Sequence, residues 1–468
     1  MRGSQTTLWG NLLPSGSPCE NRLETDGNKE VCSTPTASTS GKNSERANKP
    51  ELLEAILEPE NLNEAYQQVK RNKGSHGIDG MRVDEMRDHL KTHGEALKQA
   101  ILEGNYTPSP VRRVEIPKPD GGKRLLGIPT VIDRMIQQAM AQILTPIFET
   151  TFTANSYGFR PGKNCHQAIR KAQSYMNAGN TWVVDIDLAK YFDTVNHDKL
   201  MALVARQIKD KRVLKLIRAY LNAGVMINGV VIESDKGCPQ GGPLSPLLSN
   251  VMLNELDQEL EKRRHNYCRY ADDSQIYVKS EKAAKRVMKS ITRFLEEDLK
   301  LRVNREKSAT GRVWERKYLG FSFYRKKGKI GIRIHPKSLA RVKEKIRTIT
   351  ARRNGWSMDH RLEKLRQLVT GWVNYFKIAD MKTHLRRLDQ WTRRRIRMCF
   401  WKQWKNIKAR VKNLVKLGVS KRKASNWAST RKKYWRVANT FILEKTLRID
   451  VLKKMGFCSF YEMYAQEL

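Results

Sequence analysis

The sequence predicts a mixed α/β region followed by a long α-helical region, and three observations support this. Up to about residue 335, short β-type runs bounded by turn residues alternate with helical patterns. From about residue 336 onward, apolar residues recur at helical spacing in long basic stretches. The length of 468 residues, with 39% hydrophobic residues, is enough for two to four domains.

The charge of the chain is strongly basic and unevenly distributed. Lys and Arg total 89 against 48 Asp and Glu, which gives a net charge of +41. Residues 321–468 carry 40 basic and 9 acidic residues, whereas residues 1–320 carry 49 and 39. A polyanion such as nucleic acid is the partner that such a field favours, over anionic lipid or a merely basic soluble protein. No apolar run reaches the length of a membrane span, so no membrane partner is expected.

The N-terminus and the cysteines exclude several classes of protein. Residues 1–50 are rich in Ser, Thr, Gly, Asn and Pro, which is typical of a disordered leader. The seven cysteines form no C-x-x-C pair and no zinc-type spacing, so we expect reduced thiols, a cytoplasmic location and no zinc.

The individual elements follow from local patterns. Residues 51–73 predict two short helices, and residues 111–116 and 123–128 predict a hairpin around the turn PKPDGG. A buried strand is expected at 181–188, and two strands joined at a tight turn at 267–278. The expected helices span 131–147, a segment from about 196, 244–262, 338–351, 360–376 and 384–409.

Four aspartates form the main candidate site. Asp185 and Asp187 lie two residues apart on one strand, so their side chains share a face. Asp272 and Asp273 lie at a turn between apolar strands, where adjacent acids are costly unless something positive binds them. Mg²⁺ takes carboxylate and phosphate oxygens, and two such ions can drive phosphoryl transfer. The alternative is that Asp272 and Asp273 only form a turn.

Three segments in order resemble the motifs of reverse transcriptases. They are DLAKYFD at 187–193, GCPQGGPLSPLLSN at 237–250 and YADD at 270–273. Four more segments are similar to group II intron reverse transcriptases, or maturases: PKPDGGKRLLGIP at 117–129, SYGFRP at 156–161, YLGF at 318–321 and GWVNYF at 371–376. The resemblance covers about residues 51–465.

The resemblance implies a right-hand polymerase fold in an α/β (α+β) chain. The fingers and palm would span 51–335, an α-helical thumb 336–380, and a helical maturase domain that binds RNA 381–468. Because no cysteine-bearing endonuclease segment is visible, we expect the type that lacks this domain.

The resemblance also implies roles for the acids. Asp187 and Asp272 would be the ligands that two Mg²⁺ ions share, with Asp273 binding more weakly or tuning the site. Asp187 is preferred to Asp185 because Phe192 then follows five residues later, as the family pattern D-x-x-x-x-F requires.

Further residues would bind the nucleotide and the primer. The resemblance implies that Phe192 excludes a 2′-hydroxyl, that Gln240 contacts the sugar or base, and that Lys118 and Arg124 hold the triphosphate. The full nucleotide set is Lys118, Arg124, Leu188, Phe192 and Gln240. Tyr270 and Ala271 would shape the primer end, and Lys307 would lie near the metals or the template.

The basic helical region predicts an RNA surface. Seven of the ten tryptophans follow residue 350 and are interleaved with basic residues. The candidate RNA-binding residues are Arg393, Arg394, Arg395, Arg397, Lys402 and Lys405. For each of them singly, a solvated helix face is the alternative.

The expected function is an RNA-directed DNA polymerase that binds its group II intron RNA, assists its splicing and copies it into cDNA during intron mobility. Its partners would be the intron RNA, an RNA template with a DNA primer, dNTPs and target DNA. Two alternatives are a splicing maturase with an unused polymerase, and a reverse transcriptase repurposed for defence or DNA repair.

Overall fold

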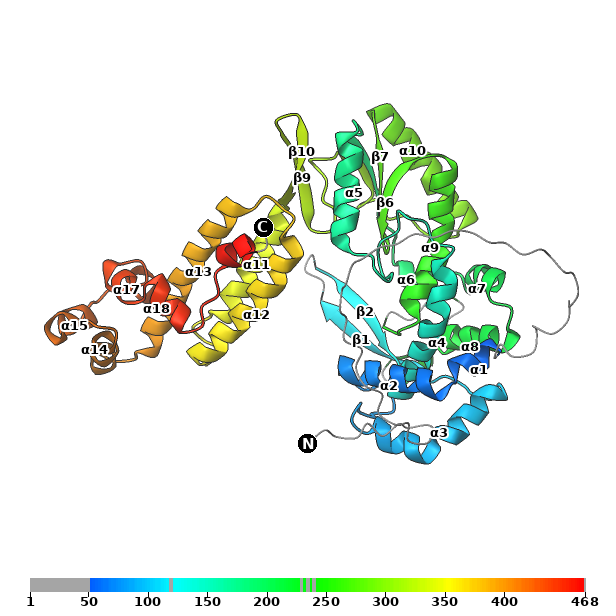
Figure 1. Ribbon diagram of the computed structural model, residues 1–468, viewed down its shortest axis with the longest axis horizontal. Coiled ribbons are helices and arrows are strands. Elements are labelled where there is room, and N and C mark those ends of the chain that lie inside the picture. Colours follow the sequence, from blue (N-terminus) through cyan, green and yellow to red (C-terminus); the bar gives the residue numbers. More distant parts are fainter. Residues whose placement is uncertain (1–50, 118–120, 228–229, 233–235, 238–240, 467–468) are drawn as a thin grey trace, which may run out of the picture.

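The computed structural model describes residues 51–117, 121–227, 230–232, 236–237 and 241–466. Figure 1 shows an α/β body on the right and a helical body on the left. Within the described residues, every named strand lies before residue 335 and every later element is a helix. The predicted order, α/β first and α-helical afterwards, is therefore confirmed. Among the described helices, none is long and apolar enough to cross a membrane.

The first sheet is built around the predicted hairpin. Its strand order is β2-β1-β4-β5, with β1 Val111–Pro117, β2 Lys123–Ile128, β4 Val225–Ile227 and β5 Val230–Ile232. The three helices before it are α1 Leu52–Ile56, α2 Pro59–Asn72 and α3 Met86–Leu102. After β2 the side chain of Thr130 accepts a hydrogen bond from the Asp133 N–H and caps α4, Val131–Glu149. The predicted hairpin, the two short helices predicted within residues 51–73 and the helix predicted at 131–147 are confirmed.

The second sheet has the order β6-β7-β3-β8. Its strands are β3 Trp182–Ile186, β6 Asn266–Tyr270, β7 Asp273–Val278 and β8 Ala309–Arg312. The central strand β3 is antiparallel to both neighbours, and its apolar residues Val183, Val184 and Ile186 are buried. The helices α5 Cys165–Asn177, α9 Ser245–Lys262 and α10 Glu281–Arg293 pack on this sheet. The predicted strands at 181–188 and 267–278 are confirmed.

Shorter elements connect the two sheets and lead into the helical body. They are α6 Tyr191–Thr194, α7 His197–Gln207, α8 Lys211–Asn222, the π-helix Phe294–Asp298, and the hairpin β9 Phe321–Lys326 with β10 Lys329–Ile334. Asn196 caps α7 by accepting a hydrogen bond from the Lys199 N–H at 2.8 Å. The helix expected from about residue 196 is therefore confirmed.

The helical body holds nine named helices among its described residues. They are α11 Pro336–Ile349, α12 Met358–Phe376, α13 Lys382–Gln403, α14 Ile407–Lys416, α15 Lys421–Ala428, α16 Tyr434–Val437, α17 Phe441–Thr446, α18 Ile449–Lys454 and α19 Phe460–Gln466. The buried carboxylate of Asp389 accepts hydrogen bonds from the Phe460 and Tyr461 N–H groups, both at 2.9 Å, and so fastens α19 to α13.

One predicted boundary is wrong. The helix expected at 384–409 ends at Gln403, and a new helix begins at Ile407. Trp404 leaves the helical conformation and is buried beside Trp401, with ring centroids 5.8 Å apart. Asn406 then caps α14 by accepting a hydrogen bond from the Ala409 N–H at 2.8 Å. Apolar spacing alone did not reveal this break.

Candidate active site

Asp187 lies one residue beyond the end of β3, and a neighbouring loop fixes its backbone. Its N–H donates to the Ser308 hydroxyl at 3.0 Å, and its carbonyl accepts from the Asn304 N–H at 2.8 Å. The same loop carries Lys307. Since β3 and β7 pair with Ile186 opposite Ser274, Asp187 leaves the sheet beside Asp273.

The turn between β6 and β7 carries the adjacent aspartates. Ala271 adopts a left-handed conformation with φ of +56° and is buried. Gly158 packs so closely against Ala271 that a Cβ added to Gly158 would lie 2.2 Å from the Ala271 nitrogen. Asn250 of α9 donates to the Gly158 carbonyl at 2.9 Å and holds that segment in place. The SYGFRP segment thus supports the turn, a role that the sequence analysis did not assign.

A buried arginine holds the turn from the other side. The Arg269 guanidinium is fully buried and pairs with Asp257 of α9 at 2.5 Å. It also donates to the Ala271 carbonyl at 2.9 Å and to the Asn250 side chain at 3.0 Å. Because every bond is charge-assisted or buried, the position of the turn is tightly constrained. Arg269 and Asp257 carry no motif of their own, so the sequence analysis missed them.

The carboxylates meet at one cavity of about 520 Å³. Asp185, Asp187 and Asp273 line it together with the amines of Lys307 and Lys317. The opposite wall comes from α11 and α12 and from the YLGF segment, and includes Arg341, Lys345, Trp372, Tyr375 and Phe376. Asp272 is half-buried at the adjoining turn. The predicted acids and Lys307 therefore gather in one place.

The electrostatics of the cavity fit a divalent cation. Although the Asp273 side chain is exposed, desolvation by the surrounding protein and the charges of the three neighbouring aspartates raise its pKa to about 7. Desolvation is the largest cause of this shift, and the charges of Asp272, Asp185 and Asp187 add to it because these carboxylates lie close to Asp273. Oxygen ligands with excess negative charge suit Mg²⁺.

Asp185 has a different environment from Asp187. The Arg316 guanidinium donates to it at 2.8 and 3.2 Å, and the Gln275 amide donates at 3.3 Å. Burial raises the pKa of Asp185, and the charge of Arg316 opposes this. The charge of Asp185 is thus already paired with Arg316, which makes Asp185 the weaker candidate for a metal ligand.

The candidate nucleotide side is partly described. Gly241 packs on β2, where an added Cβ would lie 2.4 Å from the Gly127 carbonyl oxygen, and Gly237 packs on the backbone of Phe192. Within the GCPQGG segment, Gly241 therefore lies against the hairpin and Gly237 lies against the half-buried Phe192.

The remaining nucleotide candidates have mixed placements. Arg124 is exposed on β2, and Leu188 is buried and bridges to Val303. Lys118 and Gln240 lie outside the described residues. Tyr270 is half-buried next to Ala271 at the end of β6.

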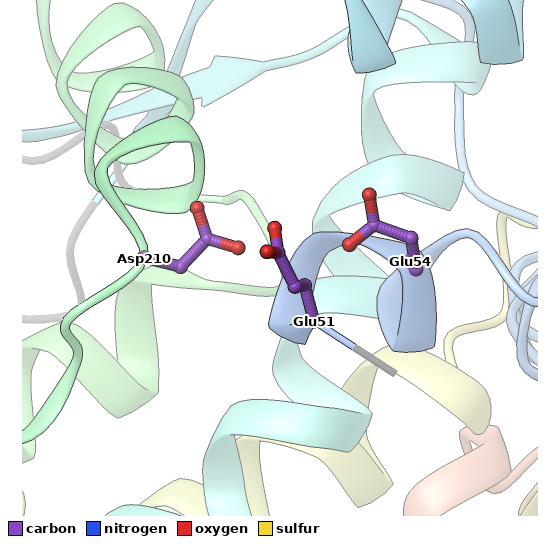
Figure 2. Close-up of side chains that lie close together, drawn as sticks. All are labelled: Glu51, Glu54 and Asp210. Carbon is purple, nitrogen blue, oxygen red and sulfur yellow. The ribbon is translucent and has the colours of Figure 1, made fainter. Parts of the chain in front are cut away.

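A second acidic cluster is a poor metal site. Glu51, Glu54 and Asp210 come together where α1 meets the start of α8 (Figure 2). Arg212 pairs with all three, at 2.5, 2.6 and 3.2 Å respectively. Hydrogen bonding to Arg212 lowers the pKa of Glu54. The arginine already neutralises this cluster, so the four aspartates remain the candidate metal centre.

Most of the candidate RNA-binding arginines on α13 make contacts within the protein. Arg394 lies 3.9 Å from the Trp435 ring centroid and donates to the Trp435 carbonyl. Arg395 donates to Thr350, and Arg397 donates to the Leu447 carbonyl. Arg393 is half-buried, whereas Lys402 and Lys405 are exposed. The RNA-binding role of all six residues stays a prediction.

Comparisons with known proteins agree with this geometry. Residues 116–323 match the family model for reverse transcriptase (RNA-dependent DNA polymerase), and residues 339–418 match the group II intron maturase-specific domain. Protein YkfC of Escherichia coli is 38% identical over 321 residues, which cover 60% of this chain and 84% of that protein.

Two further relatives match over a smaller share of their length. The group II intron-encoded protein LtrA of Lactococcus lactis is 38% identical over 44% of this chain and 34% of LtrA. An uncharacterised 91 kDa protein in the cob intron of Schizosaccharomyces pombe is 37% identical over 43% of this chain and 25% of that protein. The matches thus span 34% and 25% of these two proteins.

Fold, site and comparisons together define a nucleic-acid polymerase of the reverse transcriptase class. More narrowly, the chain belongs to the group II intron reverse transcriptases, which join an RNA-directed DNA polymerase to a maturase-specific domain.

Proposed function

We propose that the protein extends a DNA primer on an RNA template at the cavity between β3 and the β6–β7 turn, with Asp187, Asp272 and Asp273 holding two Mg²⁺ ions. The observation that carries this is the convergence of the carboxylates on one cavity that also contains Lys307 and Lys317. These three carboxylates would hold the ions, and the chemistry supplied there would be Lewis-acid activation of the primer 3′-hydroxyl and charge stabilisation of the leaving pyrophosphate.

The chain's own residues would orient the substrates. Lys307 and Lys317 offer mobile positive charges to phosphates near the acids. Phe192 would stand beside the sugar of a dNTP, and the packing of Gly237 against the Phe192 backbone supports this position. Arg124, together with Lys118, would hold the triphosphate from the β1–β2 hairpin.

The proposal assigns the parts of a right hand. The second sheet, β6-β7-β3-β8, would be the palm, and the hairpin β1–β2 would belong to the fingers within residues 51–335. The helices of residues 336–380 would be the thumb, which faces the carboxylates across the cavity through Arg341 and Lys345. Residues 381–468 would form the maturase domain.

The maturase-specific match supports a role for the protein with an intron RNA. The protein would bind its own intron RNA, assist splicing, and copy the RNA into cDNA at a target DNA, in the cytoplasm of a bacterium. Its net charge of +41 supports a nucleic-acid partner.

Primer extension on an RNA template with dNTPs and Mg²⁺ tests the polymerase assignment. Asp187→Asn should abolish extension, because it removes a carboxylate ligand while keeping the shape of the side chain. Asp198→Asn is the matched control, since Asp198 is an exposed carboxylate on α7 that pairs with Arg218 at 2.7 Å. Equal extension by both variants would overturn the assignment.

A further inference from the structure

A second cavity of about 280 Å³ lies between α11 and α13, apart from the carboxylates. Its lining residues recur at helical spacing on the facing sides of the two helices. They are Leu339, Lys343 and Arg347 of α11 and His384, Arg387, Leu388 and Trp391 of α13. Arg341 and Lys345 line the carboxylate cavity instead, so α11 presents different faces to the two cavities.

The charge of this second cavity is entirely basic. Lys343, Arg347 and Arg387 line it, and no acidic residue does. Within the described part of the chain, Lys343 and Arg387 have no ion-pair or hydrogen-bond partner, and Arg347 pairs only with the exposed Glu344 beyond the lining. The first turn of α13, which carries His384, contains no acid that would offset the positive end of the helix dipole. Such a site favours an anion.

The floor of the cavity suits a flat, partly apolar group. Leu339 and Leu388 supply aliphatic surface. The Trp391 ring lies 5.6 Å from the Arg347 guanidinium and 5.3 Å from that of Arg395. Indole rings and guanidinium planes are the surfaces on which unstacked bases of single-stranded RNA are held. An acidic peptide would meet the charges but would make no use of this stacking surface.

We propose that this cavity binds one unstacked nucleotide of single-stranded RNA, with its base on Trp391 or Arg347 and its phosphate on Lys343 and Arg387. This inference rests on the proposed function, because it assigns a contact to the RNA that the maturase domain binds. All of the lining residues fall within residues 339–418, the segment that matches the maturase-specific family model. That location favours a folded RNA over the template–primer duplex.

Binding of a short oligouridylate by the full chain tests the proposal. Lys343→Ala with Arg387→Ala should weaken binding about ten-fold or more and should lower the slope of log K against log salt by about 0.7 for each lost phosphate contact. Lys382→Ala is the matched control, since Lys382 is exposed on α13 and lies outside the cavity. A 4-thiouridine in the oligonucleotide should crosslink to the peptide that carries Trp391.

The outcomes separate this proposal from the proposed function. Unchanged affinity in the double variant, with crosslinks elsewhere, overturns the nucleotide cavity while leaving RNA binding intact. Equal binding of an oligothymidylate (DNA) of the same length, or displacement by a polyglutamate peptide at equal concentration, overturns the assignment to RNA. A wild-type protein that binds no RNA contradicts the proposed function itself.

Discussion

At the candidate active site, Gly158 packs closely against the backbone of Ala271. The left-handed φ of Ala271 turns the chain after β6, so that Asp272 lies in the turn and Asp273 begins β7. A non-glycine residue rarely adopts this conformation unless its surroundings enforce it. Here Gly158 on one side and the Arg269 guanidinium on the other enforce it.

Gly158→Ala should therefore reduce activity more than stability. The added Cβ would lie 2.2 Å from a backbone nitrogen, so the turn must shift. Displacing catalytic groups by about 1 Å costs on the order of 100-fold in rate. Gly371→Ala on α12 is the control, since its Cβ meets nothing within 4 Å. Primer extension and thermal unfolding of both variants check this, and full activity of Gly158→Ala would contradict it.

The buried pair Arg269–Asp257 should be costly to break. Removing one partner leaves an uncompensated buried charge, so Asp257→Asn should lower the free energy of unfolding by about 3–5 kcal/mol. Glu255 lies on α9, as Asp257 does, and forms a more exposed pair with Arg206 of α7. Arg206→Ala breaks that pair and should lower the free energy of unfolding by at most about 1 kcal/mol. Urea unfolding measures both, and similar values for the two variants would refute the argument.

At the scale of elements, alternating tryptophans and arginines join the hairpin β9–β10 to the second sheet. Arg312 of β8 lies 4.6 Å from the Trp182 ring centroid and 5.6 Å from that of Trp314. Arg325 of β9 lies 4.7 Å from the Trp314 centroid. Trp314 therefore contacts both arginines and links the two elements.

Trp314→Ala should loosen this hairpin locally. Loss of two cation–π contacts at a partly exposed site is worth about 1–2 kcal/mol. Faster hydrogen exchange of the β9–β10 amides, with the β3–β7 amides unchanged, is the expected result. Arg325→Gln removes only one of the two contacts and should have a smaller effect. Unchanged exchange in Trp314→Ala would show that the stack does not hold the hairpin.

Helices and strands could be predicted from the sequence where the hydrophobic periodicity and the turn residues indicated the same boundaries. The hairpin β1–β2, the two strands around Ala271–Asp272 and the helices α4 and α9 follow directly from periodicity and turn residues. The end of α13 at Gln403 did not, because it depends on the burial of Trp404 against Trp401. The hydrophobic pattern continues through that break, so only tertiary packing reveals it.

At the scale of the whole molecule, the aspartates of the candidate site could be picked out from the sequence, but the residues that hold them in position could not. Asp187, Asp272 and Asp273 stand in recognisable motifs. Arg316, which pairs with Asp185, lies 131 residues away in the sequence, and Arg269 is one basic residue among many. Contacts of this kind exist only once the sheet has formed, so a single sequence does not reveal them.

The charge distribution predicts how RNA binding responds to salt. Residues 321–468 carry 40 basic and 9 acidic residues, so the helical body should neutralise many phosphates. With 6–10 phosphate contacts, affinity should fall by roughly 10³–10⁵ between about 50 and 200 mM salt. Filter binding across this range measures the slope, and an affinity that hardly depends on salt would contradict the interpretation.

Iron-directed backbone cleavage tests the metal site most directly. Fe²⁺ in place of Mg²⁺, with ascorbate and peroxide, should cut the chain near Asp187 and near the turn at Asp272 and Asp273. Excess Mg²⁺ and Asp187→Asn should each suppress these cuts. Cleavage confined to the cluster of Glu51, Glu54 and Asp210, or cuts that Asp187→Asn leaves unchanged, would contradict the account.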